Sequence, residues 1–204
     1  MEEGKWIARL PQEDFCQATG TPAVFKYESD GGPGIRTILS LLSGSSNARS
    51  DKAAFARAQL AFWLLAATDG HAKNFSIFLH RGGEYRMTPL YDVLSMWPII
   101  GNGPNLVSPF KARLALALRA KNPHYQLATI QTRHWRALAL QTGVADAFDG
   151  MLALVGGAPS ALQRVEHELP ADFPEPLWLA VKAGVLAQCE RFEAGLDREN
   201  NTAP

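Results

Sequence analysis

Hydrophobic and polar positions along the chain predict one long helix near its centre. Good helix formers run without interruption over residues 51–67, and the apolar residues among them become denser toward the C-terminal end. We therefore expect that end of the helix to be buried. A shorter helix is expected at residues 35–42, between a glycine-rich loop at 29–34 and a polar break at 43–47.

After the long helix the pattern becomes that of a β-hairpin. Two short runs of strand-forming residues, 75–80 and 84–90, flank the turn Arg81-Gly82-Gly83. Beyond the hairpin, proline and glycine separate further segments of helical character, which are 111–119, 125–142, 145–155, 158–168 and 177–198. The expected fold is therefore mainly α, a helical bundle with one β-hairpin.

The composition is that of an ordinary globular protein and adds one candidate surface. Of the 204 residues, 47% are hydrophobic and 20% are charged, which excludes a disordered or fibrous chain. Twenty Lys and Arg residues balance twenty Asp and Glu residues, so broad electrostatic binding to nucleic acid is not expected. One moderately basic stretch, whose default interpretation is a solvated helix face, holds Lys121, His124, Arg133, His134 and Arg136.

The cysteines and the start of the chain indicate a cytoplasmic protein. Cys16 and Cys189 are far apart and lack the spacing of a zinc site, so both are expected to be plain thiols. The acidic start at residues 1–5 has no secretory-signal pattern, and no window reaches the roughly 20 apolar residues of a membrane span. No membrane association is expected.

Candidate chemistry is concentrated in the loop 68–74, between the long helix and the hairpin. Asp69 and Asn74 are in this loop, and Asp92 follows the second strand. Since the two arms of the hairpin have similar lengths, the chain should return Asp92 close to Asn74. Two carboxylates and an amide would thus meet on a rigid scaffold. Asp followed by Gly70 is also a common helix end, so a purely structural role for Asp69 stays open on spacing alone.

Phosphoryl transfer needs a set of this kind. One carboxylate orients the acceptor hydroxyl, and oxygen ligands hold Mg²⁺. In protein kinases, four residues separate the catalytic-loop Asp from the metal-binding Asn, and a second Asp follows a short hairpin. Asp69, Asn74 and Asp92 reproduce that order. The first spacing alone recurs by chance, whereas its combination with the helix, the hairpin and the second Asp is more specific.

Four blocks of the sequence extend this pattern over most of the chain. They are residues 10–17, 26–34, 66–76 and 88–95, and in this order they resemble the signature blocks of HipA-type toxin serine/threonine kinases. The resemblance implies that residues 1–204 form a protein-kinase-like C-terminal lobe whose hairpin carries the metal-binding Asp. Few residues precede the first block, and they hold no glycine-rich loop or phosphate-pairing lysine. We therefore expect the N-terminal, ATP-clamping lobe to be absent from this chain.

The resemblance also implies a role for individual side chains. Asp69 would be the catalytic carboxylate, while Asn74 and Asp92 would hold Mg²⁺ against the phosphates of ATP. The remaining candidates would lie near the nucleotide, and they are His71, Lys73, Gln12 and Tyr91. For Lys73, a solvated loop side chain is an equally good interpretation.

The function implied by the resemblance is that of a toxin in a type II toxin–antitoxin system. The kinase would phosphorylate an aminoacyl-tRNA synthetase, and the resulting inhibition of translation would produce growth arrest or persistence. The implied partners are an antitoxin of the HipB type, operator DNA contacted through the antitoxin complex, and a separate N-lobe.

Two alternatives belong to other functional classes. The first is a non-catalytic remnant or split-kinase subunit that keeps the fold and the partner-binding surface. The second is a small-molecule phosphotransferase that uses the same loop, which the additional sequence blocks make less favoured. A glycine-rich loop and lysine encoded just upstream would favour a split kinase over a remnant.

Overall fold

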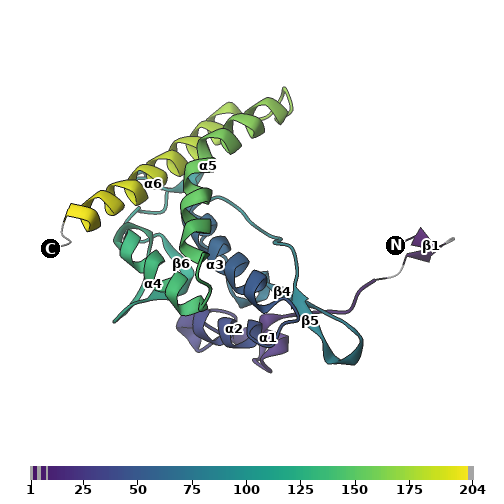
Figure 1. The fold of residues 1–204 in the computed structure, drawn as a ribbon. Coiled ribbons are helices and arrows are strands. Elements are labelled where there is room, and N and C mark those ends of the chain that lie inside the picture. Colours follow the sequence, from purple (N-terminus) through teal and green to yellow (C-terminus); the bar gives the residue numbers. More distant parts are fainter. Residues whose placement is uncertain (1, 4–5, 8, 202–204) are drawn as a thin grey trace.

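The computed structural model describes residues 2–3, 6–7 and 9–201 of the chain. Its helices are α1 (Phe15–Ala18), α2 (Ile35–Leu42), α3 (Ala48–Leu64), α4 (Thr132–Thr142), α5 (Ala147–Glu168) and α6 (Glu175–Asn201). Its strands are β1 (Glu2–Glu3), β2 (Trp6–Ile7), β3 (Gln12–Asp14), β4 (Ser76–Leu79), β5 (Tyr85–Met87), β6 (Arg113–Arg119) and β7 (Pro123–Gln126). In Figure 1, α3 lies in the middle of the molecule and packs against α4, α5 and α6.

Two predicted helices are confirmed, and their ends have local causes. Helix α2 has the predicted bounds. Helix α3 begins at Ala48 and ends at Leu64, three residues before the predicted end. It stops there because Ala66 adopts a left-handed backbone conformation with φ 49°, which a continuing helix does not allow.

Helix α5 replaces two predicted helices. It continues through Gly156, Gly157 and Pro159, which the sequence pattern treats as a break. Proline removes one backbone hydrogen bond from a helix interior. The helix nevertheless persists because its buried residues keep one stripe at helical spacing, formed by Met151, Val155, Ala158 and Leu162. Packing of this stripe against the neighbouring helices overrides the local signal.

The predicted helix at 111–119 is wrong, because β6 occupies this segment and pairs antiparallel with β7. Leu114, Leu116 and Leu118 alternate along the strand and are buried. The intervening alanines are buried too, so the strand lacks the alternation of polar and apolar residues that marks a one-sided sheet. Ala and Leu also favour helices, which explains the error. The predicted helix at 125–142 is likewise shortened at its start, since β7 precedes α4.

The predicted hairpin is confirmed as β4 and β5, with Gly82 and Gly83 at positive φ in the turn. It belongs to a three-stranded antiparallel sheet, in which β3 pairs with β4 so that Gln12 lies opposite Phe78. The expectation of a single hairpin in a helical bundle is therefore corrected to a mainly helical fold with small sheets, among which β6 and β7 form a further hairpin.

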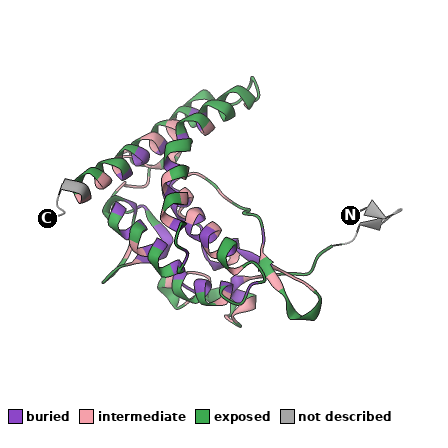
Figure 2. Cartoon of the chain, viewed as in Figure 1, coloured by how far each residue is buried: buried purple, intermediate pink, exposed green. Residues whose placement is uncertain are grey.

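The core surrounds α3, as the buried positions in Figure 2 show. Phe15, Phe55, Phe62 and Phe75 form an aromatic cluster on one side of this helix, with ring centroids 5.2–6.2 Å apart. On the other side, the rings of Trp63 and Trp135 lie 5.6 Å apart. None of the described helices is long and apolar enough to span a membrane.

Candidate active site

The C-terminal end of α3 fixes the direction in which the chain enters the candidate loop. Ala67 N donates to Phe62 O at 2.7 Å, and Ala66 N donates to Trp63 O at 3.2 Å. These two bonds form a Schellman motif, which usually has glycine where Ala66 stands. A left-handed alanine costs about 1–2 kcal/mol. This strained turn lies three residues before Asp69.

Gly70 holds the loop against the helix. A Cβ atom at this position would lie 2.1 Å from Cδ2 of the Phe62 ring. No real side chain tolerates so short a distance, so the backbone of Gly70 packs directly on the ring. The neighbouring Asp69 is thereby kept at the surface, where its side chain is 67% exposed.

Asp92 and Asn74 lie together, as the similar lengths of the hairpin arms predict. Nδ2 of Asn74 donates to Oδ2 of Asp92 at 2.8 Å. Asp92 adopts φ 55°, a left-handed conformation that Asp tolerates better than most residues. The residue does not belong to the hairpin itself, because β5 ends at Met87 and Asp92 lies in the loop that follows.

The chain after Asp92 returns to the end of α3 and binds its free carbonyl groups. The hydroxyl of Ser95 donates to Leu65 O at 2.6 Å, and Met96 N donates to Ala66 O at 3.2 Å. Nε1 of Trp97 donates to Leu64 O at 2.8 Å. The last carbonyls of a helix lack partners within it, so these bonds satisfy them and hold the Asp92 segment beside the Asp69 loop.

One buried acceptor has the chemistry of a metal ligand. Oδ1 of Asn74 has no hydrogen-bond partner among the described residues, and the residue is only 1% exposed. An amide oxygen beside the carboxylate of Asp92 fits Mg²⁺, which needs only one or two protein carboxylates and completes its shell with water and phosphate. No cluster of three or more His, Cys, Asp or Glu residues occurs in the described part of the chain, so the donor set does not resemble a zinc site.

The side chain of His71, within the loop, is nearly buried, at 7% exposed. Burial lowers the pKa of its imidazole, and the charge of Lys26 lowers this pKa further. The ring is therefore neutral at pH 7. Its Nδ1 has no partner within the described residues, and Nε2 lies 3.9 Å from Oδ1 of Asp69.

Lys73 is held by an ion pair with the end of β3. Its Nζ lies 2.8 Å from Oδ2 of Asp14, which raises the pKa of the lysine. Asp14 also caps α1, because its Oδ1 accepts from Gln17 N at 2.9 Å. The carbonyl of Lys73 accepts from the Tyr91 hydroxyl at 2.8 Å.

Of the two remaining predicted residues, Tyr91 is hydrogen-bonded to the loop 68–74 and Gln12 is not. The hydroxyl of Tyr91 is also hydrogen-bonded to that of Ser76, and burial raises the pKa of Tyr91. Gln12 is exposed on β3, and no hydrogen bond or ion pair links its side chain to the other candidates within the described residues.

Sequence reasoning assigned no role to Tyr27, although this residue belongs to one of the four blocks. Its hydroxyl donates to Oδ1 of Asp69 at 2.6 Å. This bond, together with burial, raises the pKa of Tyr27 to about 12. Beside the contact lies a hollow of about 240 Å³, lined in part by Tyr27, Thr68 and Asp30. Only the position of Tyr27 before a glycine-rich loop could have suggested its importance.

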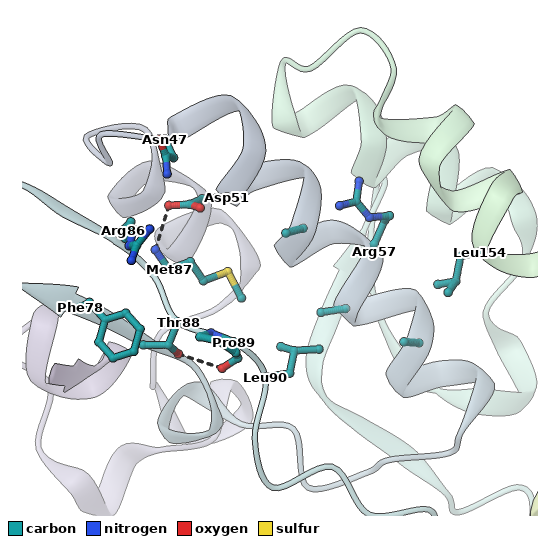
Figure 3. A pocket seen from close by; sticks show the side chains of 13 residues that line it. Asn47, Asp51, Arg57, Phe78, Arg86, Met87, Thr88, Pro89, Leu90 and Leu154 are labelled. Atoms are coloured by element: carbon teal, nitrogen blue, oxygen red, sulfur yellow. Dashed lines mark hydrogen bonds between the residues drawn. The ribbon is translucent and has the colours of Figure 1, made fainter. Parts of the chain in front are cut away.

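A larger pocket of about 570 Å³ lies between α3 and the chain that leaves β5 (Figure 3). It is mostly apolar and contains none of Asp69, Asn74 and Asp92. The carboxylate of Asp51 in this pocket already accepts hydrogen bonds from the Ser45 hydroxyl and, at 2.8 Å, from Met87 N. The candidate chemistry therefore belongs to the loop and not to this pocket.

The basic stretch is not simply a solvated helix face. His134 is only 2% exposed, and its ring stacks on that of His124 with centroids 4.0 Å apart. Arg136 pairs with Glu199, the two side chains approaching to 3.1 Å. These contacts give the stretch a structural role.

Comparisons with known proteins agree with the fold. The family model described as HipA-like C-terminal domain matches residues 2–164. Over 112 residues the chain is 36% identical to a Sinorhizobium fredii protein named "Putative kinase Y4mE", which corresponds to 54% of this chain and 26% of that protein. The fold matches a chain from a Shewanella oneidensis MR-1 complex of HipA, HipB and operator DNA, with a TM-score of 0.81 and 22% identity.

These findings define first the fold, which is shared with a chain of the Shewanella complex. More narrowly, the chain belongs to the HipA-like C-terminal domain family, because the family model matches most of its length. The structural match covers 100% of this chain and 49% of the other. The chain thus spans about half of the structural relative and about a quarter of the curated one.

Proposed function

We propose that this chain is the phosphate-transferring part of an ATP-dependent serine/threonine protein kinase of a type II toxin–antitoxin system. The observation that carries the proposal is the buried, unpartnered Oδ1 of Asn74 beside the Asp92 carboxylate, with the exposed carboxylate of Asp69 in the same loop. The arrangement supplies an acceptor-orienting carboxylate and two oxygen ligands, which is what phosphoryl transfer requires of a protein.

Each residue then has a defined task. Asn74 and Asp92 would hold Mg²⁺, which supplies positive charge next to the phosphates of ATP when it is bound. Asp69 receives the proton of the acceptor hydroxyl through Oδ2, since Oδ1 already accepts from Tyr27. His71 anchors the loop through its buried, neutral ring, and Tyr91 fixes the backbone at Lys73.

The transfer balances without a further reactant. The acceptor oxygen of a serine or threonine forms a bond to the γ-phosphorus as the bond to the β–γ bridging oxygen breaks. The electron pair of the broken bond leaves with ADP, and the hydroxyl proton goes to Asp69. The protein contributes positioning and a fixed electrostatic environment.

The resemblance and the structural relative suggest the partners. A HipB-type antitoxin and operator DNA accompany HipA in the Shewanella complex, and we propose the same kind of partners here. The proposed protein substrate is an aminoacyl-tRNA synthetase, whose phosphorylation would inhibit translation and cause persistence. A substrate of the translation machinery makes the cytoplasm the proposed compartment. An N-lobe, supplied by adjoining or separate sequence, would complete the clamp on ATP.

Radioactive phosphate transfer from γ-labelled ATP to a synthetase substrate tests the proposal. Asp69→Asn should lower the rate by about 10²–10⁴-fold, because it removes the carboxylate that accepts the proton. Asp149→Asn is the matched control, since it makes the same change at an exposed position on α5. Equal rates in the wild type and in Asp69→Asn would contradict the proposed role.

A binding module without catalysis is the alternative candidate. One observation favours it: within the loop 68–74, the only lysine is tied to Asp14 and the only histidine is neutral, so no free cation of the loop faces a phosphate. A folded wild-type chain that transfers no phosphate, even with an N-lobe supplied, would support this alternative.

A further inference from the structure

The carboxylate of Asp69 is bound on one side only. Its Oδ1 accepts the Tyr27 hydroxyl at 2.6 Å, and Nε2 of His71 lies 3.9 Å from the same oxygen. No hydrogen bond reaches Oδ2 from the described residues, and the side chain is largely exposed. The two oxygens are therefore distinguished, one held by the protein and one open to a reactant.

Tyr27 itself is firmly held. Its carbonyl accepts from Asp30 N at 3.1 Å and from Gly32 N at 3.0 Å. A Cβ atom on Gly32 would lie 2.0 Å from Phe25 O, so this tight loop requires glycine. The segment is thus folded back on itself around the tyrosine.

Two further contacts join the segment to the rest of the molecule. Ala72 N donates to Lys26 O at 3.3 Å, which links the segment to the loop that carries Asp69. On the other side, the carboxylate of Glu28 accepts from Ala117 N at 2.7 Å and from Nη2 of Arg119 at 2.6 Å. A tyrosine held between the catalytic loop and β6 has little freedom to move away from Asp69.

The ring of Tyr27 also packs against the loop. It meets the His71 ring edge to face, with centroids 5.1 Å apart. The hydroxyl remains protonated across the physiological range, because its hydrogen bond to Asp69 raises the pKa of Tyr27. Tyr27 is therefore a permanent donor in a fixed place.

We propose that Tyr27 is the positioning residue of Asp69, holding Oδ1 so that Oδ2 faces the hydroxyl of the acceptor. The proposal rests on the proposed kinase function and deepens it. Without the hydroxyl of Tyr27, the exposed carboxylate would sample several rotamers, and only some of them would present an oxygen to the acceptor. The residue acts through Asp69 and does not itself exchange a proton.

Steady-state kinetics with the full chain give the first test, with an N-lobe supplied if transfer requires one. Tyr27→Phe keeps the ring and should lower kcat by about 10- to 100-fold while leaving the KM for ATP unchanged. The control is Tyr85→Phe. It removes a hydroxyl that donates to Leu41 O at 2.6 Å and has no contact with Asp69. This control should leave kcat unchanged. A purely structural role for Tyr27 would instead affect the melting temperature without a selective loss of kcat.

Two kinetic results would overturn the proposal. An unchanged kcat in Tyr27→Phe would remove the positioning role. A raised kcat would mean that the tyrosine hydroxyl competes with the acceptor for Asp69, so that it blocks the site instead of arranging it.

A spectroscopic test does not depend on activity. NMR of the chain labelled at tyrosine Cζ would follow ionisation between pH 9 and pH 11, with Tyr27→Phe assigning the signal and circular dichroism verifying the fold. Tyr27 should stay protonated in the wild type and ionise at lower pH in Asp69→Asn. Identical titrations would show that the bond is absent in solution and would overturn the proposal. If this bond is present but the wild type transfers no phosphate, the kinase function fails and the positioning role falls with it.

Discussion

Two regions that share α3 are stabilised in different ways. At the C-terminal end of α3, the candidate site combines an exposed carboxylate with two non-glycine residues at positive φ, and two buried polar atoms there, Nδ1 of His71 and Oδ1 of Asn74, have no partner among the described residues. On the side of α4, α5 and α6, buried apolar residues dominate, among them Trp135, Met151 and Phe192. The first region carries the proposed chemistry, and the second supplies the packing.

This difference indicates how the molecule tolerates a site that lowers its folding stability. A buried polar group without a partner costs about 1–3 kcal/mol, and left-handed alanine adds a similar amount. Apolar packing elsewhere on α3 must offset these costs. Substitutions in the helical region should therefore change stability most, whereas substitutions at the site should change binding and catalysis most.

The largest expected change in stability comes from the helical region. Trp135 is fully buried and packs against Trp63, so Trp135→Ala should lower the free energy of unfolding by about 3–5 kcal/mol. Urea unfolding measures the effect. Trp135→Phe is the control and should cost less, because it keeps a ring and removes an indole N–H that has no partner in the described residues. A loss below 1 kcal/mol for the alanine variant would contradict this account of the region.

Acid should weaken the helical region through His134. Burial lowers the pKa of this imidazole from 6.5 to about 4, and the charges of His124 and Arg133 contribute. The unfolded chain binds the proton at higher pH than the folded chain does. The contribution to stability is therefore complete above pH 6.5 and is lost as the pH falls toward 4, by up to about 3 kcal/mol.

The free energy of unfolding measured from pH 8 to pH 4 tests this effect. His134→Gln should flatten the decline in that window. His167→Gln changes an exposed histidine on α5 and should leave the decline as it is. An equally steep decline in His134→Gln would show that His134 does not cause it.

Two glycine substitutions, one in each region, test the same difference through smaller expected effects. Gly70→Ala would force a Cβ into the Phe62 ring, so it should cost about 1–3 kcal/mol and displace Asp69, with loss of phosphate transfer. Gly156→Ala faces open space on α5 and should stabilise the protein by about 0.5–1 kcal/mol. Thermal unfolding and the transfer assay measure both. Equal effects of the two substitutions would remove the distinction between the regions.

Local patterns in the sequence predict the parts of the fold that depend on local signals. The bounds of α2, the hairpin β4–β5 and the approach of Asp92 to Asn74 all follow from turns and arm lengths. The strand β6 could not be found in this way, because its Leu and Ala residues are buried on both faces. Its conformation depends on tertiary contacts with elements distant in the sequence.

In the candidate site, too, some features follow from local sequence and others depend on tertiary contacts. Asp69, Asn74 and Asp92 lie within one local unit, and their order in the sequence is informative. The contacts of Tyr27 with Asp69 and of Asp14 with Lys73 join residues 42 and 59 positions apart. Spacing along the chain gives no indication of such pairs, which form only when the N-terminal segment packs against the end of α3.

Calorimetric titration of the chain with ATP and Mg²⁺ tests whether Asn74 and Asp92 form a nucleotide and metal site. We expect Mg²⁺-dependent binding that Asp92→Asn weakens by about tenfold or more and that Asp149→Asn leaves unchanged. Circular dichroism must show that all three proteins are folded. Binding of equal strength in the wild type and in Asp92→Asn, or no binding by a folded wild-type chain even with an N-lobe supplied, would contradict the assignment of Asn74 and Asp92 to a nucleotide and metal site.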